Sequence, residues 1–203
     1  FISGLSSAFV LIFGTALILP SIQAFGKKSL STSHFMGVGF GIVISSILVT
    51  FLGELGFHWD DLWIGVAVLS VILSVPIFIC TPNEILQQSY SQNSNYKNNF
   101  SFSLISISYG LYGFGYVILG TFISAMARET SGLEATEMYV WLLVGLAGIP
   151  MVIFWPWFGQ KIGNDLALFF ACAIMGLGVL MPVLLENKVG ITSASILLGS
   201  TFI

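Results

Sequence analysis

Seven apolar stretches, separated by short polar connections, follow one another along the chain. Their approximate ranges are 2–22, 35–53, 63–80, 101–126, 139–158, 167–185 and 190–203. A bilayer-spanning helix needs about 20 apolar residues, and every stretch except the last is close to that length. The stretches do not alternate apolar and polar residues as the strands of a membrane barrel do. The pattern therefore predicts an all-α polytopic membrane protein.

Composition supports the same fold class. Of the 203 residues, 56% are apolar and 7% are charged, whereas soluble domains carry about 25% charged residues. A soluble core of this size could not bury so much apolar surface, so the lipid bilayer is the expected partner. Apolar runs reach both Phe1 and Ile203, which favours a fragment of a longer chain. Cys80 and Cys172 lie in or beside apolar runs, which argues against a disulfide framework and against a metal site.

The charged residues lie in the connections and alternate in sign. The first, third and fifth connections hold the bases Lys27, Lys28, Lys97 and Lys161, with Glu84 and Asp165 as acids. The second, fourth and sixth connections are mainly acidic, with Glu54, Asp60, Asp61, Glu129, Glu134, Glu137 and Glu186 against Arg128 and Lys188. Because cytoplasmic loops are enriched in Lys and Arg, the odd connections are predicted to be cytoplasmic.

Polar and tryptophan-containing segments mark the ends of the runs. Residues 81–100 form the longest and most polar connection, which we expect to be a cytoplasmic linker between three helices in 1–80 and four in 101–203. All five tryptophans fall at predicted run ends, as in the aromatic belt of a membrane protein: Trp59, Trp63, Trp141, Trp155 and Trp157.

The fourth run carries one face of phenols and small residues. At about 100° per residue, one third of the helix circumference holds Tyr109, Tyr112, Gly113, Tyr116, Gly120 and Ser124. Two interpretations remain open from these residues alone. The face either packs against neighbouring helices, with Gly113 and Gly120 allowing close approach, or it lines a wet cavity.

The second run contains a pair of glycines four residues apart, Gly37 and Gly41. This small-xxx-small spacing predicts a helix-packing surface. The pattern favours packing over a nucleotide-binding fingerprint, because the third glycine has the wrong spacing and no strand precedes the motif.

Ionisable residues are absent from the middle of every run. Such residues mark proton relays and ion pathways, so coupling groups lie elsewhere or transport depends on hydroxyls and shape. The sequence also has no serine–histidine–aspartate set and no pair of intramembrane aspartates. We therefore expect no enzyme activity, catalytic residue, cofactor, metal or nucleic-acid partner.

Tyr109 to Arg128 resembles a helix of the major facilitator superfamily, in particular of the bacterial YbfB/YjiJ-type group. The resemblance is carried by Tyr-Gly-x-x-Gly-Phe-Gly-Tyr, followed by Thr-Phe and Ala-Arg. Residues 37–42, Gly-Val-Gly-Phe-Gly-Ile, are similar to the group's glycine-rich fifth helix. The resemblance implies that the chain covers the fourth to tenth helices. Residues 1–80 would end the first helical half and residues 101–203 would begin the second.

The superfamily's cytoplasmic signature loop would fall on residues 156–165. Gly159, Lys161 and Gly163 fit this loop. Gln160 stands in place of the signature's acid, and Asn164 and Asp165 stand in place of its basic pair. These differences put charge-relay gating at this loop in doubt.

The resemblance implies a secondary active transporter that works by alternating access, with its site near the midplane. The first, fourth and seventh runs would line the cavity, with Tyr109, Tyr112 and Tyr116 as the main solute-pathway residues. Weaker candidates are Ser6, Ser7, Thr15, Thr192, Ser193 and Ser195. The expected substrate is a small organic solute, with a coupling proton or ion left open, and the expected location is the bacterial inner membrane. A non-transporting polytopic receptor or assembly protein remains the alternative.

Overall fold

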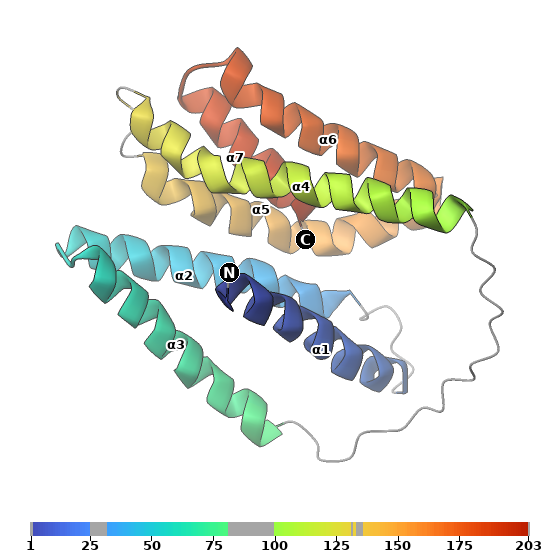
Figure 1. Cartoon of the computed structure of the whole chain (residues 1–203), viewed down its shortest axis with the longest axis horizontal. Coiled ribbons are helices and arrows are strands. Elements are labelled where there is room, and N and C mark those ends of the chain that lie inside the picture. The colour runs from blue at the N-terminus through green and yellow to red at the C-terminus, as the bar shows by residue number, and fades with distance from the viewer. Residues whose placement is uncertain (1, 25–31, 81–99, 131, 133–135, 203) are drawn as a thin grey trace.

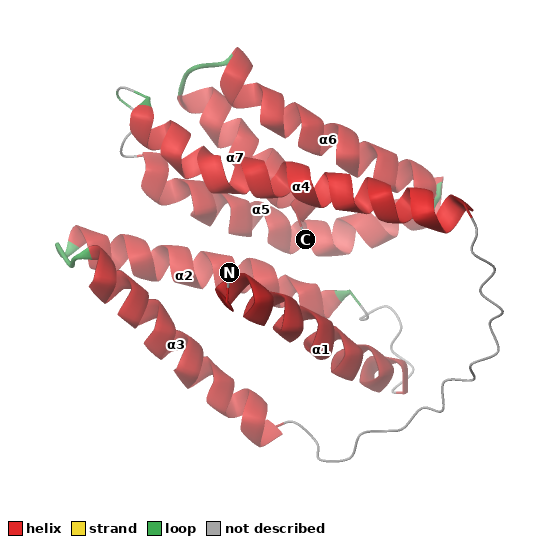
Figure 2. Ribbon diagram, viewed as in Figure 1, coloured by secondary structure: helices red, strands yellow, loops and turns green. Residues whose placement is uncertain are grey.

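The computed structural model describes residues 2–24, 32–80, 100–130, 132 and 136–202. These residues form α-helices and one short 3-10 helix, with no strand among them (Figure 2). The elements are α1 (Ile2–Ala24), η2 (Ser33–Phe35), α2 (Met36–Glu54), α3 (Trp59–Cys80), α4 (Phe100–Glu129), α5 (Glu137–Ile162), α6 (Asn164–Leu184) and α7 (Lys188–Phe202). Each predicted apolar run is therefore a helix, and the all-α prediction is confirmed.

Five of the described helices are long and apolar enough to cross a membrane: α2 with η2, α3, α4, α5 and α6. The apolar part of α1, Gly4–Leu19, is shorter, and α7 has 15 residues. Large apolar side chains are exposed along the helices, including Val10 at 74%, Trp63 at 73% and Phe78 at 88%. Apolar surface of this extent requires a lipid solvent, so the protein is a multi-pass membrane protein.

The helices run alternately between two ends. Helices α2, α4 and α6 end at the same end of the bundle, where α3, α5 and α7 begin (left in Figure 1). This end, called the acidic end below, carries every described carboxylate except Asp165: Glu54, Asp60, Asp61, Glu129, Glu137 and Glu186. At the opposite end α5 meets α6. Of the predicted linker 81–100, only Phe100 is among the described residues. The charged residues Lys27, Lys28, Glu84, Lys97 and Glu134 also lie outside the described residues.

The packed core lies among α4, α5, α6 and α7. Its fully buried members include Ile123 of α4, Val140 and Val144 of α5, and Leu198 of α7. Met175 contributes from α6. Helices α1, α2 and α3 lie on the other side of α5, and α2 packs directly against α5 (Figure 1).

Close approach between α2 and α5 depends on two glycines. A Cβ added at Gly145 would lie 3.0 Å from the carbonyl oxygen of Gly39, and one added at Gly39 would lie 3.3 Å from that of Gly145. The predicted pair Gly37 and Gly41 does not make this contact, since a Cβ at either position would meet nothing within 4 Å. The prediction of packing through Gly37 and Gly41 is therefore wrong, because the side of the helix that faces α5 is the one that carries Gly39.

The connection between α5 and α6 is shorter than the sequence predicts. Helix α5 continues to Ile162, and Gly163 alone separates it from α6. Gly163 has φ +95°, a left-handed conformation that suits glycine because it has no Cβ. Trp155 and Trp157 therefore lie within α5 rather than at its end, and their place in an aromatic belt stays a prediction.

Candidate functional site

A cavity of about 700 Å³ lies between α1 and α2 on one side and α4, α5 and α7 on the other. It is called the tyrosine cavity below. Its lining residues are Leu11, Thr32, Phe35, Val38, Tyr109, Gly110, Tyr112, Gly113, Tyr116, Val152, Trp155, Pro156 and Phe202. None of these residues is charged, and aromatic side chains dominate. The volume is in the range of pockets that hold small organic ligands.

Three tyrosines follow one another along the cavity wall. The ring centroids of Tyr109 and Tyr112 are 6.4 Å apart, and those of Tyr112 and Tyr116 are 6.3 Å apart. This spacing arises because residues three or four apart share one face of a helix. Gly110 and Gly113 lie between the rings, and a Cβ at Gly110 would meet nothing within 4 Å. The small residues therefore leave space beside the phenols.

Two of the lining aromatic side chains also hold α7 in place. The Tyr112 hydroxyl donates a hydrogen bond to the carbonyl oxygen of Thr201. Trp155 Nε1 donates to the carbonyl oxygen of Ser200 at 2.6 Å. The ring of Phe202 meets the Tyr116 ring edge-on, with centroids 5.0 Å apart. The tyrosine face of α4 thus contacts α7 and lines the cavity at once, so the two interpretations of this face are compatible.

The weaker hydroxyl candidates do not join the tyrosines. Ser6 and Ser7 are exposed on α1. Thr15 Oγ1 lies 3.5 Å from His34 Nε2. Ser193 donates to the carbonyl oxygen of Gly190 at 3.0 Å, and Thr192 is half-buried beside it without lining the tyrosine cavity. Ser195 is fully buried and donates to the carbonyl oxygen of Ile191 at 2.8 Å.

The residues of the expected signature loop lie at the α5–α6 junction. Gly159 is buried, and a Cβ there would lie 2.8 Å from Oδ1 of Asn164. The Nζ of Lys161 lies 4.2 Å from the ring centroid of Trp157, a cation–π contact. These contacts stay within α5 and α6, and the three loop residues do not line the tyrosine cavity.

The glycines predicted to pack on α4 make contacts of different kinds. A Cβ at Gly120 would lie 3.4 Å from Cη2 of Trp141 on α5, so this glycine lies against a neighbouring helix. A Cβ at Gly113 would meet only Tyr116 of its own helix, at 3.8 Å.

Sequence reasoning missed several lining residues. Thr32 and Phe35 lie at the start of the α2 segment, where the sequence offered only a run boundary. Trp155 was assigned to an interface, and Phe202 is one of many phenylalanines in the chain. The available signal for Trp155 was its position directly before Pro156, a proline inside α5.

In the part of the chain that the structure describes, no group of three or more histidine, cysteine, aspartate or glutamate side chains could hold a metal ion.

The fold and the cavity define a multi-pass helical membrane protein with an uncharged aromatic cavity between its helices. Over residues 1–203 the chain matches the family described as "Uncharacterised MFS-type transporter YbfB", and it belongs to this family. The family places the chain among membrane transporters and confirms the resemblance seen at Tyr109–Arg128. Searches of curated proteins and of solved structures found no match.

Proposed function

We propose that the protein is a secondary active transporter that moves a small, uncharged organic solute by alternating access. The observation that carries the proposal is the cavity of about 700 Å³ lined by Tyr109, Tyr112 and Tyr116. Phenols offer both a flat apolar face and a hydroxyl, so they suit a solute with apolar and polar parts. The absence of charge among the lining residues disfavours an ionic solute, whose desolvation would not be compensated.

Alternating access requires two groups of helices that move against each other. We assign residues 1–80 to one group and residues 101–203 to the other, with residues 81–100 as a cytoplasmic linker. Support comes from the packed core of α4–α7 and from the tyrosine cavity, which lies between this core and α1 and α2. In this proposal the glycine contact between α2 and α5 is the place where the two groups pivot.

We assign the acidic end to the outside and the opposite end to the cytoplasm of a bacterial inner membrane. Lysine-rich connections favour the cytoplasmic side. The tyrosine cavity lies toward the proposed cytoplasmic end of the bundle. Its lining residues Thr32 and Phe35 are near the start of α2, and Pro156 is near the end of α5. The proposal assigns no catalytic reaction to the chain.

Uptake or efflux by the whole protein in membrane vesicles tests this function. A panel of labelled neutral solutes is measured with the native protein and with Tyr116→Phe, which keeps the ring against Phe202 but removes the hydroxyl. We expect solute-dependent flux that falls by about tenfold in Tyr116→Phe, the value of one good hydrogen bond. Tyr139→Phe, exposed at the start of α5, is the matched control and should transport normally.

Binding of a solute without any flux would contradict transport and favour the receptor alternative. Flux that is identical in Tyr116→Phe and Tyr139→Phe would keep the transporter but remove the Tyr116 hydroxyl from the site.

A further inference from the structure

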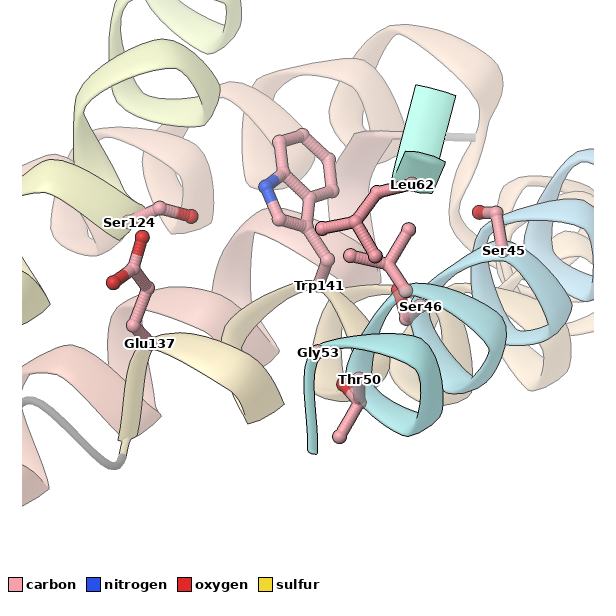
Figure 3. Close-up of a pocket in the computed structure, with 9 residues that line it drawn as sticks. Ser45, Ser46, Thr50, Gly53, Leu62, Ser124, Glu137 and Trp141 are labelled. Atoms are coloured by element: carbon pink, nitrogen blue, oxygen red, sulfur yellow. The ribbon is translucent and has the colours of Figure 1, made fainter. Parts of the chain in front are cut away.

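A second pocket lies at the acidic end of the bundle, among α2, α3, α4 and α5 (Figure 3). Its volume is about 380 Å³, and it is called the acidic-end pocket below. Its lining residues are Ser45, Ser46, Val49, Thr50, Gly53, Leu62, Ser124, Glu137 and Trp141. Figure 3 shows Trp141 in the middle, with Ser124 and Glu137 on one side and Ser46 and Thr50 on the other.

The lining combines hydroxyl groups and one carboxylate with apolar side chains, among them Val49, Leu62 and Trp141. Four hydroxyl groups come from two different helices, since Ser45, Ser46 and Thr50 belong to α2 and Ser124 belongs to α4. Ser45 donates to the carbonyl oxygen of Ile42 at 3.1 Å, which leaves its own oxygen as an acceptor.

The carboxylate in the pocket is compensated. Glu137 accepts hydrogen bonds from Nε of Arg128 at 3.1 and 3.0 Å, and from a terminal guanidinium nitrogen of the same residue. A cationic ligand would have to compete with this arginine for the carboxylate. A ligand hydroxyl could instead donate a hydrogen bond to a free lone pair of the carboxylate or to a serine oxygen, without displacing the arginine.

Trp141, together with Val49 and Leu62, gives the pocket an apolar wall. The C–H face of a polyhydroxylated molecule can lie on an indole while its hydroxyls bind the surrounding oxygens. Hydroxyls, an arginine-paired carboxylate and apolar side chains together fit an uncharged molecule with both hydroxyl groups and an apolar face better than an ion.

A smaller pocket shares lining residues with both the acidic-end pocket and the tyrosine cavity. This middle pocket, of about 260 Å³, is lined by Tyr116, Val117, Gly120, Thr121, Trp141, Val144, Leu198 and Phe202. It shares Tyr116 and Phe202 with the tyrosine cavity, and Trp141 with the acidic-end pocket.

The three pockets therefore follow one face of α4, through Tyr109, Tyr116 and Ser124 in turn. From Tyr109 to Ser124 the helix rises about 22 Å, most of the thickness of a hydrocarbon core. Trp141 lies against Gly120 of α4 at the boundary between the last two pockets.

We propose that the acidic-end pocket is a second solute site on the same pathway, which takes an uncharged molecule with several hydroxyl groups. Trp141 forms the partition between this site and the middle pocket. The proposal rests on the proposed transport function, in which a solute passes along α4 between the tyrosine cavity and the acidic end.

Protection of an introduced cysteine tests the site. Cys80 and Cys172 are replaced by serine in the whole protein, and Ser124→Cys is reacted in membrane vesicles with a membrane-impermeant thiol reagent. Ser46→Cys, on the α2 wall, provides a second reporter in case one variant does not fold. The probes are mannitol as the neutral polyol and tetramethylammonium as the cation.

We expect mannitol at about nine times its dissociation constant to slow modification of both cysteines by about tenfold, because about one tenth of the sites are then empty. Leu55→Cys is the matched control, because Leu55 is 59% exposed at the acidic end without lining the pocket. Its rate should not change with mannitol, and tetramethylammonium should protect none of the three positions.

Protection by tetramethylammonium instead of mannitol would overturn the ligand class. Equal rates with and without mannitol, or equal slowing at Leu55→Cys, would overturn the site. Solute flux in the same vesicles separates the two proposals. If the solute is transported but mannitol does not protect the cysteines, only the second site is contradicted. If mannitol protects the cysteines but no solute is transported, the binding site stands and the pathway is contradicted.

Discussion

Tyr112 illustrates how one residue can serve both packing and a cavity. Its ring lines the tyrosine cavity between those of Tyr109 and Tyr116, while its hydroxyl donates to the carbonyl oxygen of Thr201. A half-buried phenol between helices needs a hydrogen-bond partner for its hydroxyl, and a carbonyl oxygen on a neighbouring helix supplies one. The hydrogen bond fixes the ring, and the fixed ring defines the cavity wall.

Tyr112→Phe should destabilise the protein because it removes the hydrogen bond from the Tyr112 hydroxyl to the carbonyl oxygen of Thr201 on α7. We expect a loss of about 1 kcal/mol in the free energy of unfolding, typical of one interhelical hydrogen bond. Thermal unfolding of the purified protein in detergent measures this change. Tyr139→Phe should unfold at the same temperature as the native protein. If Tyr112→Phe is as stable as the native protein, the hydrogen bond to Thr201 contributes nothing to stability.

At the scale of helices, the contact between α2 and α5 joins the two groups of the proposed transport mechanism. Gly39 and Gly145 allow the two backbones to meet, and an added Cβ at Gly145 would lie 3.0 Å from both the Gly39 oxygen and the Val43 nitrogen. Backbone atoms cannot rotate away as a side chain can, so the helices themselves would have to separate.

Gly145→Ala should therefore lower both stability and transport. Overpacking of this kind costs about 1–3 kcal/mol, and it displaces the proposed pivot. Membrane abundance, thermal unfolding and solute flux are measured together. Gly41→Ala is the matched control because its Cβ would meet nothing within 4 Å. If Gly145→Ala and Gly41→Ala behave alike, α2 and α5 do not meet at this glycine.

The helices and their order could be predicted from the sequence, because an apolar run of membrane length has few alternatives to a spanning helix. The periodicity of α4 also predicted that Tyr109, Tyr112 and Tyr116 share one face. What the sequence could not predict is the rotation of each helix about its axis. That rotation depends on contacts with neighbours, so Gly39 rather than Gly37 or Gly41 meets α5. For the same reason Trp155 and Phe202 could not be assigned to the cavity.

At the scale of the whole molecule, the acidic end collects the described carboxylates of three connections. The helix directions in Figure 1 agree with the alternation of charge along the sequence. The orientation in the membrane follows from the positive-inside rule alone.

Reporter fusions test this orientation. A reporter at Asn95 should be active on the cytoplasmic side, and one at Thr136, at the start of α5, should be active on the outside. Alkaline phosphatase and a cytoplasmic fluorescent protein report opposite sides. Signals from the same side at both positions would contradict the alternating arrangement of the helices.

The central claim is that the tyrosine face of α4 borders a solute path rather than lipid, and the accessibility of Tyr116→Cys tests it most directly. The variant, without Cys80 and Cys172, is reacted with an impermeant thiol reagent in right-side-out and inside-out vesicles. Phe114→Cys, on the same helix and 67% exposed outside the cavity, is the matched control. Alternating access predicts that Tyr116→Cys reacts in both orientations while Phe114→Cys reacts in neither. Reaction of neither cysteine from either side, or equal reaction of both, would contradict the account.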